Sequence, residues 1–219
     1  MDSPFPLDAP WDDMPDVVQR RMNYGTIVAD PPWHYPSFKG RPMPYRTMTV
    51  SELRELPVGH FAAADCRLFL WATSRHLRQA FDVLKAWEFS YSLTLVWHKT
   101  GDPMQFTKSI APIHSEFVLV GRRGKPKILK ALPSSVFSLP TNNHNPHSKK
   151  PEAFLDIVES ASPGPYLELF ARRQRLGWDT WGDESLQHVD LNETASLAPH
   201  SPYATGGNVS NQDRSSDEA

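Results

Sequence analysis

The stretch Thr26-Ile27-Val28-Ala29-Asp30-Pro31-Pro32-Trp33 contains a short apolar run that stops at a carboxylate, two prolines and an indole. Such a run predicts a buried strand of a parallel sheet, and ligands of open α/β sheets bind beyond the carboxyl ends of such strands. Residues that precede proline are pushed out of the α region, so we expect Asp30 and Pro31 to be extended. Because neither proline has an N–H, this turn offers a carboxylate and carbonyl oxygens to a ligand.

A site built from acceptors beside an aromatic ring suits a planar ligand that carries an exocyclic amine. We expect the Asp30 carboxylate and the Pro31 carbonyl to accept the two amine hydrogens, while Trp33 stacks on the ring. Holding the hydrogens in this way directs the amine lone pair at an electrophile, which is catalysis by orientation and electrostatics. The alternative interpretation is a strand that ends in a proline turn beside a core tryptophan.

Length and composition restrict the class of protein. The chain has 219 residues, enough for one α/β domain with a sizeable core. No apolar run approaches the ~18 residues of a membrane helix, and the acidic N-terminus lacks the pattern of a secretory signal. Cys66 is the single cysteine, and the pair His144 and His147 has no third ligand at a suggestive spacing. We therefore expect a cytoplasmic protein with no membrane span, no disulfide and no metal site.

Charge is distributed unevenly along the chain. Residues 1–20 hold five acids and one base, residues 185–219 hold the same numbers, and residues 21–184 hold 21 lysines and arginines against 15 acids. We predict an acidic, proline-rich N-terminal segment over 1–20, a folded domain over 21–184, and a disordered acidic and polar tail over 185–219. The basic balance of the folded part suits a nucleic-acid partner.

Strand and helix patterns alternate through the predicted domain. Apolar runs predict strands near residues 26–29, 67–72, 91–97, 116–120 and 166–170. Helical spacing follows a capping box at Thr49, a candidate cap at Ser74, and Pro151. Alternating strands and helices predict an α/β fold with a mostly parallel sheet.

Three groups of charged residues are candidates for binding. Five cations lie in nine residues between Arg122 and Lys130; a loop of this kind at the rim of a catalytic face would grip phosphates, and a solvated surface loop is the equal alternative. Lys150 precedes a predicted helix, where it opposes the helix dipole and is a candidate anion ligand. Glu168 lies inside an apolar strand, so it needs either a basic partner or ligand hydroxyls.

Several motifs in this order resemble the adenine-N6 methyltransferase family that includes the catalytic subunit of the messenger-RNA methyltransferase and its prokaryotic and phage relatives. The resemblance extends from about Thr26 to Glu184. The segments that carry it are Asp30–Trp33, Pro44–Met48, Leu68–Thr73, Trp97–Thr100, His114–Glu116, Lys150–Glu152 and Glu168–Arg172. Where the family often has Gly-Asn-Glu or Gly-Asn-Gln, this chain has Gly182-Asp183-Glu184.

The resemblance implies a Rossmann-like, S-adenosylmethionine-dependent methyltransferase fold in permuted order, with the catalytic strand before the cofactor-binding strand. The catalytic residues that it implies are Asp30, Pro31, Pro32 and Trp33. Together with the basic run, the expected substrate-binding residues are Tyr45, Lys99, Arg122, Arg123, Lys125 and Lys127. The expected cofactor-binding residues are Asp30, Lys150, Glu168, Arg172, Asp183 and Glu184.

Three functions are compatible with these motifs. A compact chain without an added RNA-binding module resembles the prokaryotic DNA-modifying relatives, which favours adenine-N6 methylation of DNA. RNA adenosine methylation uses the same chemistry, and a pseudo-methyltransferase scaffold would bind nucleic acid without catalysis. The intact Asp30–Trp33 motif argues against the scaffold. The resemblance is compatible with a homodimer or with a heterodimer that contains a related subunit.

Overall fold

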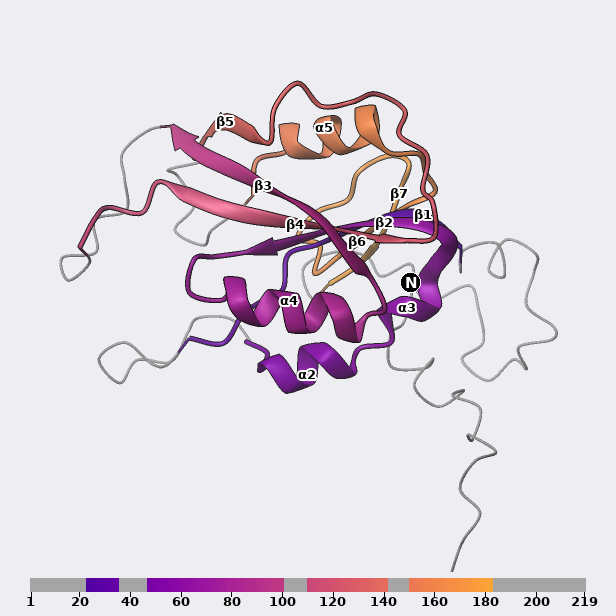
Figure 1. Ribbon diagram of the computed structural model, residues 1–219, viewed down its shortest axis with the longest axis horizontal. Helices are drawn as coiled ribbons and strands as arrows, with labels where there is room; N and C mark the ends of the chain where they lie inside the picture. The colour runs from indigo at the N-terminus through magenta and orange to yellow at the C-terminus, as the bar shows by residue number, and fades with distance from the viewer. Residues whose placement is uncertain (1–22, 36–46, 101–109, 142–149, 183–219) are drawn as a thin grey trace, which may run out of the picture.

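The protein is built on one seven-stranded sheet flanked by helices (Figure 1). The computed structural model describes residues 23–35, 47–100, 110–141 and 150–182. The strands are β1 (Tyr24–Ala29), β2 (Ala62–Ala72), β3 (Ser90–Thr100), β4 (Ser115–Arg123), β5 (Val136–Pro140), β6 (Tyr166–Leu169) and β7 (Trp178–Trp181). Their order across the sheet is β5-β3-β4-β2-β1-β6-β7.

Only β4 runs against its neighbours in this sheet. The pairs β1–β2, β1–β6, β3–β5 and β6–β7 are parallel, whereas β4 is antiparallel to both β2 and β3. The predicted α/β fold with a mostly parallel sheet is therefore confirmed. The permuted order is visible as well, because the motif strand β1 comes first in the described chain and its neighbour β6 comes near the end.

Strand β1 is buried along its whole length, as the apolar run predicts. Its side chains alternate between the two faces of the sheet. Ile27 and Ala29 face one cluster of buried side chains, and Val28 belongs to the other. The strand ends at Ala29, which pairs with Leu70 and with Leu169, so Asp30 leaves the sheet between two neighbouring strands.

The helices cover both faces of the sheet. Figure 1 shows α5 (Ala153–Ala161) on one side, and α2 (Val50–Glu55) and α4 (Leu77–Ala86) on the other. The short α3 (Val58–Phe61) leads into β2. The cap at Thr49 is confirmed: its hydroxyl accepts from the Glu52 N–H at 3.3 Å, and the Glu52 carboxylate accepts from the Thr49 N–H at 2.6 Å.

The structure corrects two local predictions. Ser74 does not cap α4, because residues 73–76 form a turn in which the His76 N–H donates to the Thr73 carbonyl at 3.0 Å, and the helix begins at Leu77. Strands β5 and β7 were not predicted. Both are short edge strands, and β5 ends in a proline, which argues against a strand when the sequence alone is read.

Two further predictions concern segments outside the described residues. The acidic segment 1–20 and the tail 185–219 both lie outside the ranges that the structure describes. Within those ranges, none of the helices has the length and apolar composition that a membrane crossing needs.

Candidate active site

The turn after β1 is held by backbone hydrogen bonds on both sides. The Asp30 N–H donates to the Leu169 carbonyl at 3.4 Å. The Pro31 carbonyl accepts from the Trp33 N–H, and the Pro32 carbonyl accepts from the Met48 N–H, both at 2.8 Å. The Pro31 oxygen expected to receive an amine hydrogen therefore already has one donor, and its second lone pair is what remains for a ligand.

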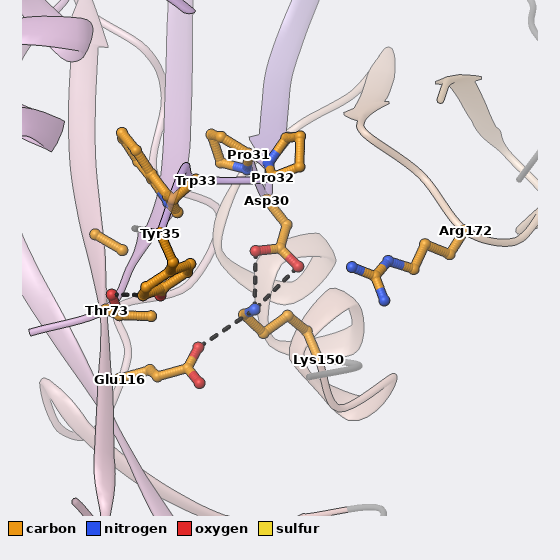
Figure 2. A pocket seen from close by; sticks show the side chains of 10 residues that line it. Asp30, Pro31, Pro32, Trp33, Tyr35, Thr73, Glu116, Lys150 and Arg172 are labelled. Atoms are coloured by element: carbon orange, nitrogen blue, oxygen red, sulfur yellow. Dashed lines mark hydrogen bonds and ion pairs between the residues drawn. The ribbon is translucent and has the colours of Figure 1, made fainter. Parts of the chain in front are cut away.

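Four charged side chains meet beyond the end of β1. The Lys150 ammonium lies 2.8 and 3.0 Å from the two carboxylate oxygens of Asp30, and 3.3 Å from the Glu116 Oε2 (Figure 2). The other Glu116 oxygen accepts from the Lys99 Nζ at 2.5 Å. Because β4 runs antiparallel to β2, its first residues lie at the same end of the sheet as the last residues of β1. Glu116 is therefore close to Asp30. Two acids and two bases thus form one continuous network.

Burial determines how these groups titrate. The Glu116 side chain is 5% exposed and Lys150 is 14% exposed. Burial raises the pKa of Asp30, and Lys150 offsets this only in part. Burial alone would lower the pKa of Lys150, but the two carboxylates outweigh it and raise that pKa. Burial would also raise the pKa of Glu116, yet Lys150 and Lys99 bring it below the ordinary value. Lys150 therefore stays charged, and its charge favours the ionised form of both Asp30 and Glu116.

Two hollows adjoin this network. The first is a cleft with about 380 Å³ of space that is continuous with solvent, and the second has about 430 Å³. Both are lined by Asp30, Lys150 and Arg172. The first is completed by Pro31, Pro32, Trp33, Tyr35, Ala72, Thr73 and Glu116. The second is completed by Val28, Trp71, Pro151, Phe154, Leu155, Glu168, Phe170 and Arg173.

Glu168 lines the second hollow with an acceptor that lacks a partner. Its Oε2 is buried and accepts no hydrogen bond among the described residues. Burial raises the pKa of Glu168 to about 7, with a smaller opposing effect from Arg173. Of the two alternatives for this residue, a close basic partner or a ligand, the orphaned oxygen favours ligand hydroxyls.

Trp33 does not present an open stacking surface. The indole is 4% exposed, donates from Nε1 to the Trp71 carbonyl at 3.1 Å, and stacks on the His76 ring at 5.3 Å between centroids. The alternative of a core tryptophan therefore describes the position of this residue. Figure 2 shows the indole pointing away from the Asp30 and Lys150 charges.

The basic run lies at the end of the sheet that is opposite the candidate active site. Arg122 pairs with Arg67, which pairs with Thr26 of β1, so it lies roughly 13 Å along the strands from Asp30. Arg123 donates to the Gly59 carbonyl at 2.6 Å and forms an ion pair with Glu88. Of the two alternatives for this run, its position favours the solvated surface loop; sequence proximity to β4 does not reveal which end of the strand faces the site.

The outcome for the remaining site residues is mixed. Asp30, Lys99, Lys150, Glu168 and Arg172 come together around the two hollows. Tyr45, Asp183 and Glu184 lie outside the described residues, as do His144 and His147. Glu116 was missed as a site residue, although an acid at the start of an apolar strand is the same signal that marked Glu168.

A charged site of this shape, at the strand ends of this permuted sheet, places the chain among the α/β methyltransferases. The family model for MT-A70 matches residues 24–184. The chain belongs to the MT-A70 family, and it is a methyltransferase.

Curated relatives support this assignment. The type II methyltransferase M.MunI of Mycoplasma sp is 32% identical over 203 residues, which cover 82% of this chain and 83% of that protein. The N(6)-adenine-specific methyltransferase METTL4 of Homo sapiens is 31% identical, over 81% of this chain and 41% of that protein. The N6-methyladenosine RNA methyltransferase MTA1 of Pyricularia oryzae (strain 70-15 / ATCC MYA-4617 / FGSC 8958) is 25% identical, over 87% and 54%. The chain thus spans only about half the length of the last two.

Proposed function

We propose that this protein transfers the methyl group of S-adenosylmethionine to N6 of adenine in DNA. The observation that carries the proposal is that two hollows share one wall, formed by Asp30, Lys150 and Arg172. A group transfer needs a donor and an acceptor on opposite sides of the reacting atoms, held close enough to react. A shared wall of charged groups supplies this arrangement.

The second hollow has features that fit S-adenosylmethionine. The orphaned Glu168 oxygen suits ribose hydroxyl donors, and the half-buried aromatic side chain of Phe170 suits the flat adenine ring. Lys150 and Arg172 would meet the carboxylate of the methionine part. When bound, the cofactor supplies an electrophilic methyl group beside Asp30.

The first hollow has features that fit the acceptor amine. The Asp30 carboxylate accepts hydrogen bonds from the amine and opposes the positive charge that develops on N6 during transfer. Lys150 alone would repel that charge, but Asp30 and Glu116 lie within 3.3 Å of its ammonium and offset it. Lys150 therefore favours the ionised form of Asp30 against the effect of burial, and the two acids leave no net positive charge beside the reacting nitrogen.

The choice of DNA rests on the type II methyltransferase M.MunI, which this chain matches over 83% of its length. RNA is the second candidate, because the similarity to the RNA methyltransferase MTA1 extends over 87% of this chain.

The direct test is incubation with methyl-labelled S-adenosylmethionine and separate pools of unmethylated DNA and RNA, followed by nucleoside analysis. We expect label in N6-methyldeoxyadenosine. Label in N6-methyladenosine alone would replace DNA by RNA. Label in another base would refute the adenine assignment, and label in neither pool would favour the non-catalytic scaffold.

A further inference from the structure

Two aromatic side chains line the first hollow, Trp33 and Tyr35, and Tyr35 is the more exposed of the two. Trp33 is almost fully buried, whereas Tyr35 is half-buried and lies on the wall of the cleft with Thr73 and Glu116. In Figure 2 the Tyr35 ring lies on the same side of the turn as the Asp30 and Lys150 charges. Tyr35 therefore offers an aromatic surface in the same cleft as the Asp30 carboxylate.

A chain of hydrogen bonds fixes the Tyr35 ring. Its hydroxyl lies 3.0 Å from the Thr73 hydroxyl, which lies 3.1 Å from Nδ1 of His76. The other ring nitrogen of His76, Nε2, lies 3.0 Å from the His34 carbonyl. A carbonyl can only accept, so Nε2 carries a proton, and in the neutral ring Nδ1 must accept from Thr73. Thr73 then accepts from Tyr35, and the direction of every bond is determined.

His76 contacts three consecutive residues that follow the prolines. It stacks on Trp33, bonds the backbone of His34, and meets Tyr35 edge to face at 4.6 Å between centroids. The imidazole is 6% exposed. Burial lowers the pKa of His76, and the neighbouring charges of Arg75 and His34 lower it further against the effect of the His34 carbonyl. His76 is therefore neutral at physiological pH, and the bond directions given above for a neutral ring apply.

We propose that Tyr35 is a contact for the acceptor base, and that Thr73 and His76 are positioning residues that hold its ring in the cleft. The inference rests on the proposed function, because it assigns the first hollow to the adenine. It also gives Trp33 a structural role. The indole packs against one face of His76 in the core, whereas Tyr35 presents its ring to the base in the cleft.

The base contact is tested by binding of fluorescent single-stranded dA12 and dT12 to the full chain, measured by anisotropy. Thymine has no exocyclic amine for Asp30, so only dA12 should use the cleft. We expect Tyr35→Leu to weaken dA12 binding about tenfold, the usual scale for one lost base–aromatic stack. Binding of dT12 should change less than twofold. The matched control is Tyr91→Leu, which removes an exposed tyrosine from the far end of β3.

Equal weakening of dA12 and dT12, or no change in either, would overturn the base contact. The positioning residues are tested by a pair of variants. Thr73→Val keeps the shape but removes the hydroxyl, and should lose part of the preference for dA12; Thr73→Ser keeps the hydroxyl and should retain it. Identical behaviour of the two variants would remove Thr73 and His76 from this role.

These measurements separate the two proposals. If the wild-type protein methylates neither nucleic-acid pool but its dA12 preference depends on Tyr35, the proposed function fails and the base contact stands. If it methylates adenine and Tyr35→Leu leaves KM and kcat unchanged, the base contact fails alone. If both hold, Tyr35→Leu should raise KM for DNA about tenfold and leave cofactor affinity unchanged.

Discussion

The two ends of the sheet both carry concentrated charge, and they use it differently. At the carboxyl end of β1, Asp30, Glu116 and Lys150 bond to one another beside two hollows. At the amino end, Arg67 donates to the carbonyls of Pro126 and Lys127, both at 3.1 Å, and to the Ser162 hydroxyl at 2.9 Å.

The difference lies in what the charges have as partners. Arg67 and Arg123 donate mainly to backbone carbonyls, and Arg123 also pairs with the exposed acid Glu88, so these bonds fasten loops to the sheet. Acids satisfy Lys150, and the same acids remain available to a ligand through their other lone pairs. A cluster of charged side chains is therefore a candidate binding site when its members can still form hydrogen bonds and lie beside a cavity. When all their hydrogen bonds go to the protein itself, the cluster only stabilises the fold.

The largest expected effect comes from removing the cation that both acids share. Lys150→Met leaves two largely buried carboxylates: Glu116 keeps its bond to Lys99, and Asp30 keeps the weaker influence of the Arg172 charge. We expect the free energy of unfolding to fall by about 3–5 kcal/mol at pH 7, as for other broken buried ion pairs. Urea unfolding of the cofactor-free protein measures it, with Lys85→Met on the exposed side of α4 as the control.

Acid should partly restore the stability of Lys150→Met, since protonated carboxyls need no counter-charge. A loss as small as that of Lys85→Met would show that the network contributes little to the fold. Calorimetric titration should also show weaker cofactor binding by the variant, since Lys150 lines the hollow assigned to it.

Asp30→Asn should reduce methyl transfer with little effect on folding. The amide presents a donor to the amine and removes the charge that opposes positive N6 in the transition state. We expect a loss of roughly 3–4 kcal/mol, on the order of a hundred- to a thousand-fold in rate. Single-turnover methylation and circular dichroism measure rate and fold. A folded variant with the wild-type rate would reduce Asp30 to the polar end of a strand.

Glu168→Gln should change how stability depends on pH. The carboxyl titrates near 4.5 in the unfolded chain and near 7 in the folded protein, so the wild type loses stability as pH rises from about 4.5 to about 7. The loss should be on the order of 3 kcal/mol and absent from the variant. Melting temperatures of both cofactor-free proteins from pH 4 to pH 8 test this. Parallel curves, like those expected for the exposed Asp82→Asn, would refute it.

The smallest effect is expected at the amino end of the sheet. The side chains of Arg122, Lys125 and Lys127 are exposed, so replacing all three by alanine should leave the rate of methyl transfer within twofold. Nucleic-acid binding at several salt concentrations tests their role as substrate contacts. If the slope of log binding constant against log salt concentration falls in magnitude by up to ~3, these side chains do contact phosphates. An unchanged slope would leave the charges as a solvated surface.

The sequence was sufficient for those features that depend on local patterns. The apolar run before Asp30, the capping box at Thr49 and the position of Glu168 in a strand each carry a local signal, and the structure agrees with all three. The edge strand β5 was missed because it has only five residues and ends in a proline, which is typical of strand edges and of loops alike.

Features that depend on the direction of a distant strand could not be found in this way. Glu116 enters the site because β4 runs antiparallel, and the same reversal carries Arg122 away from it. The pairing of His76 with Tyr35 crosses from the turn before α4 to the turn after β1, so spacing along the chain gave no indication of it.

The position of β1 has a consequence for how the protein is made. The strand pairs on one side with β2, which soon follows it, and on the other with β6, which is synthesised much later. Contacts between such distant segments form slowly, and until they form one edge of β1 lacks its partner. Glu168 and Arg172 arrive with that last docking step, so an emerging chain has no complete site until residues near 170 have left the ribosome. Methylating activity should therefore appear late and all at once during synthesis.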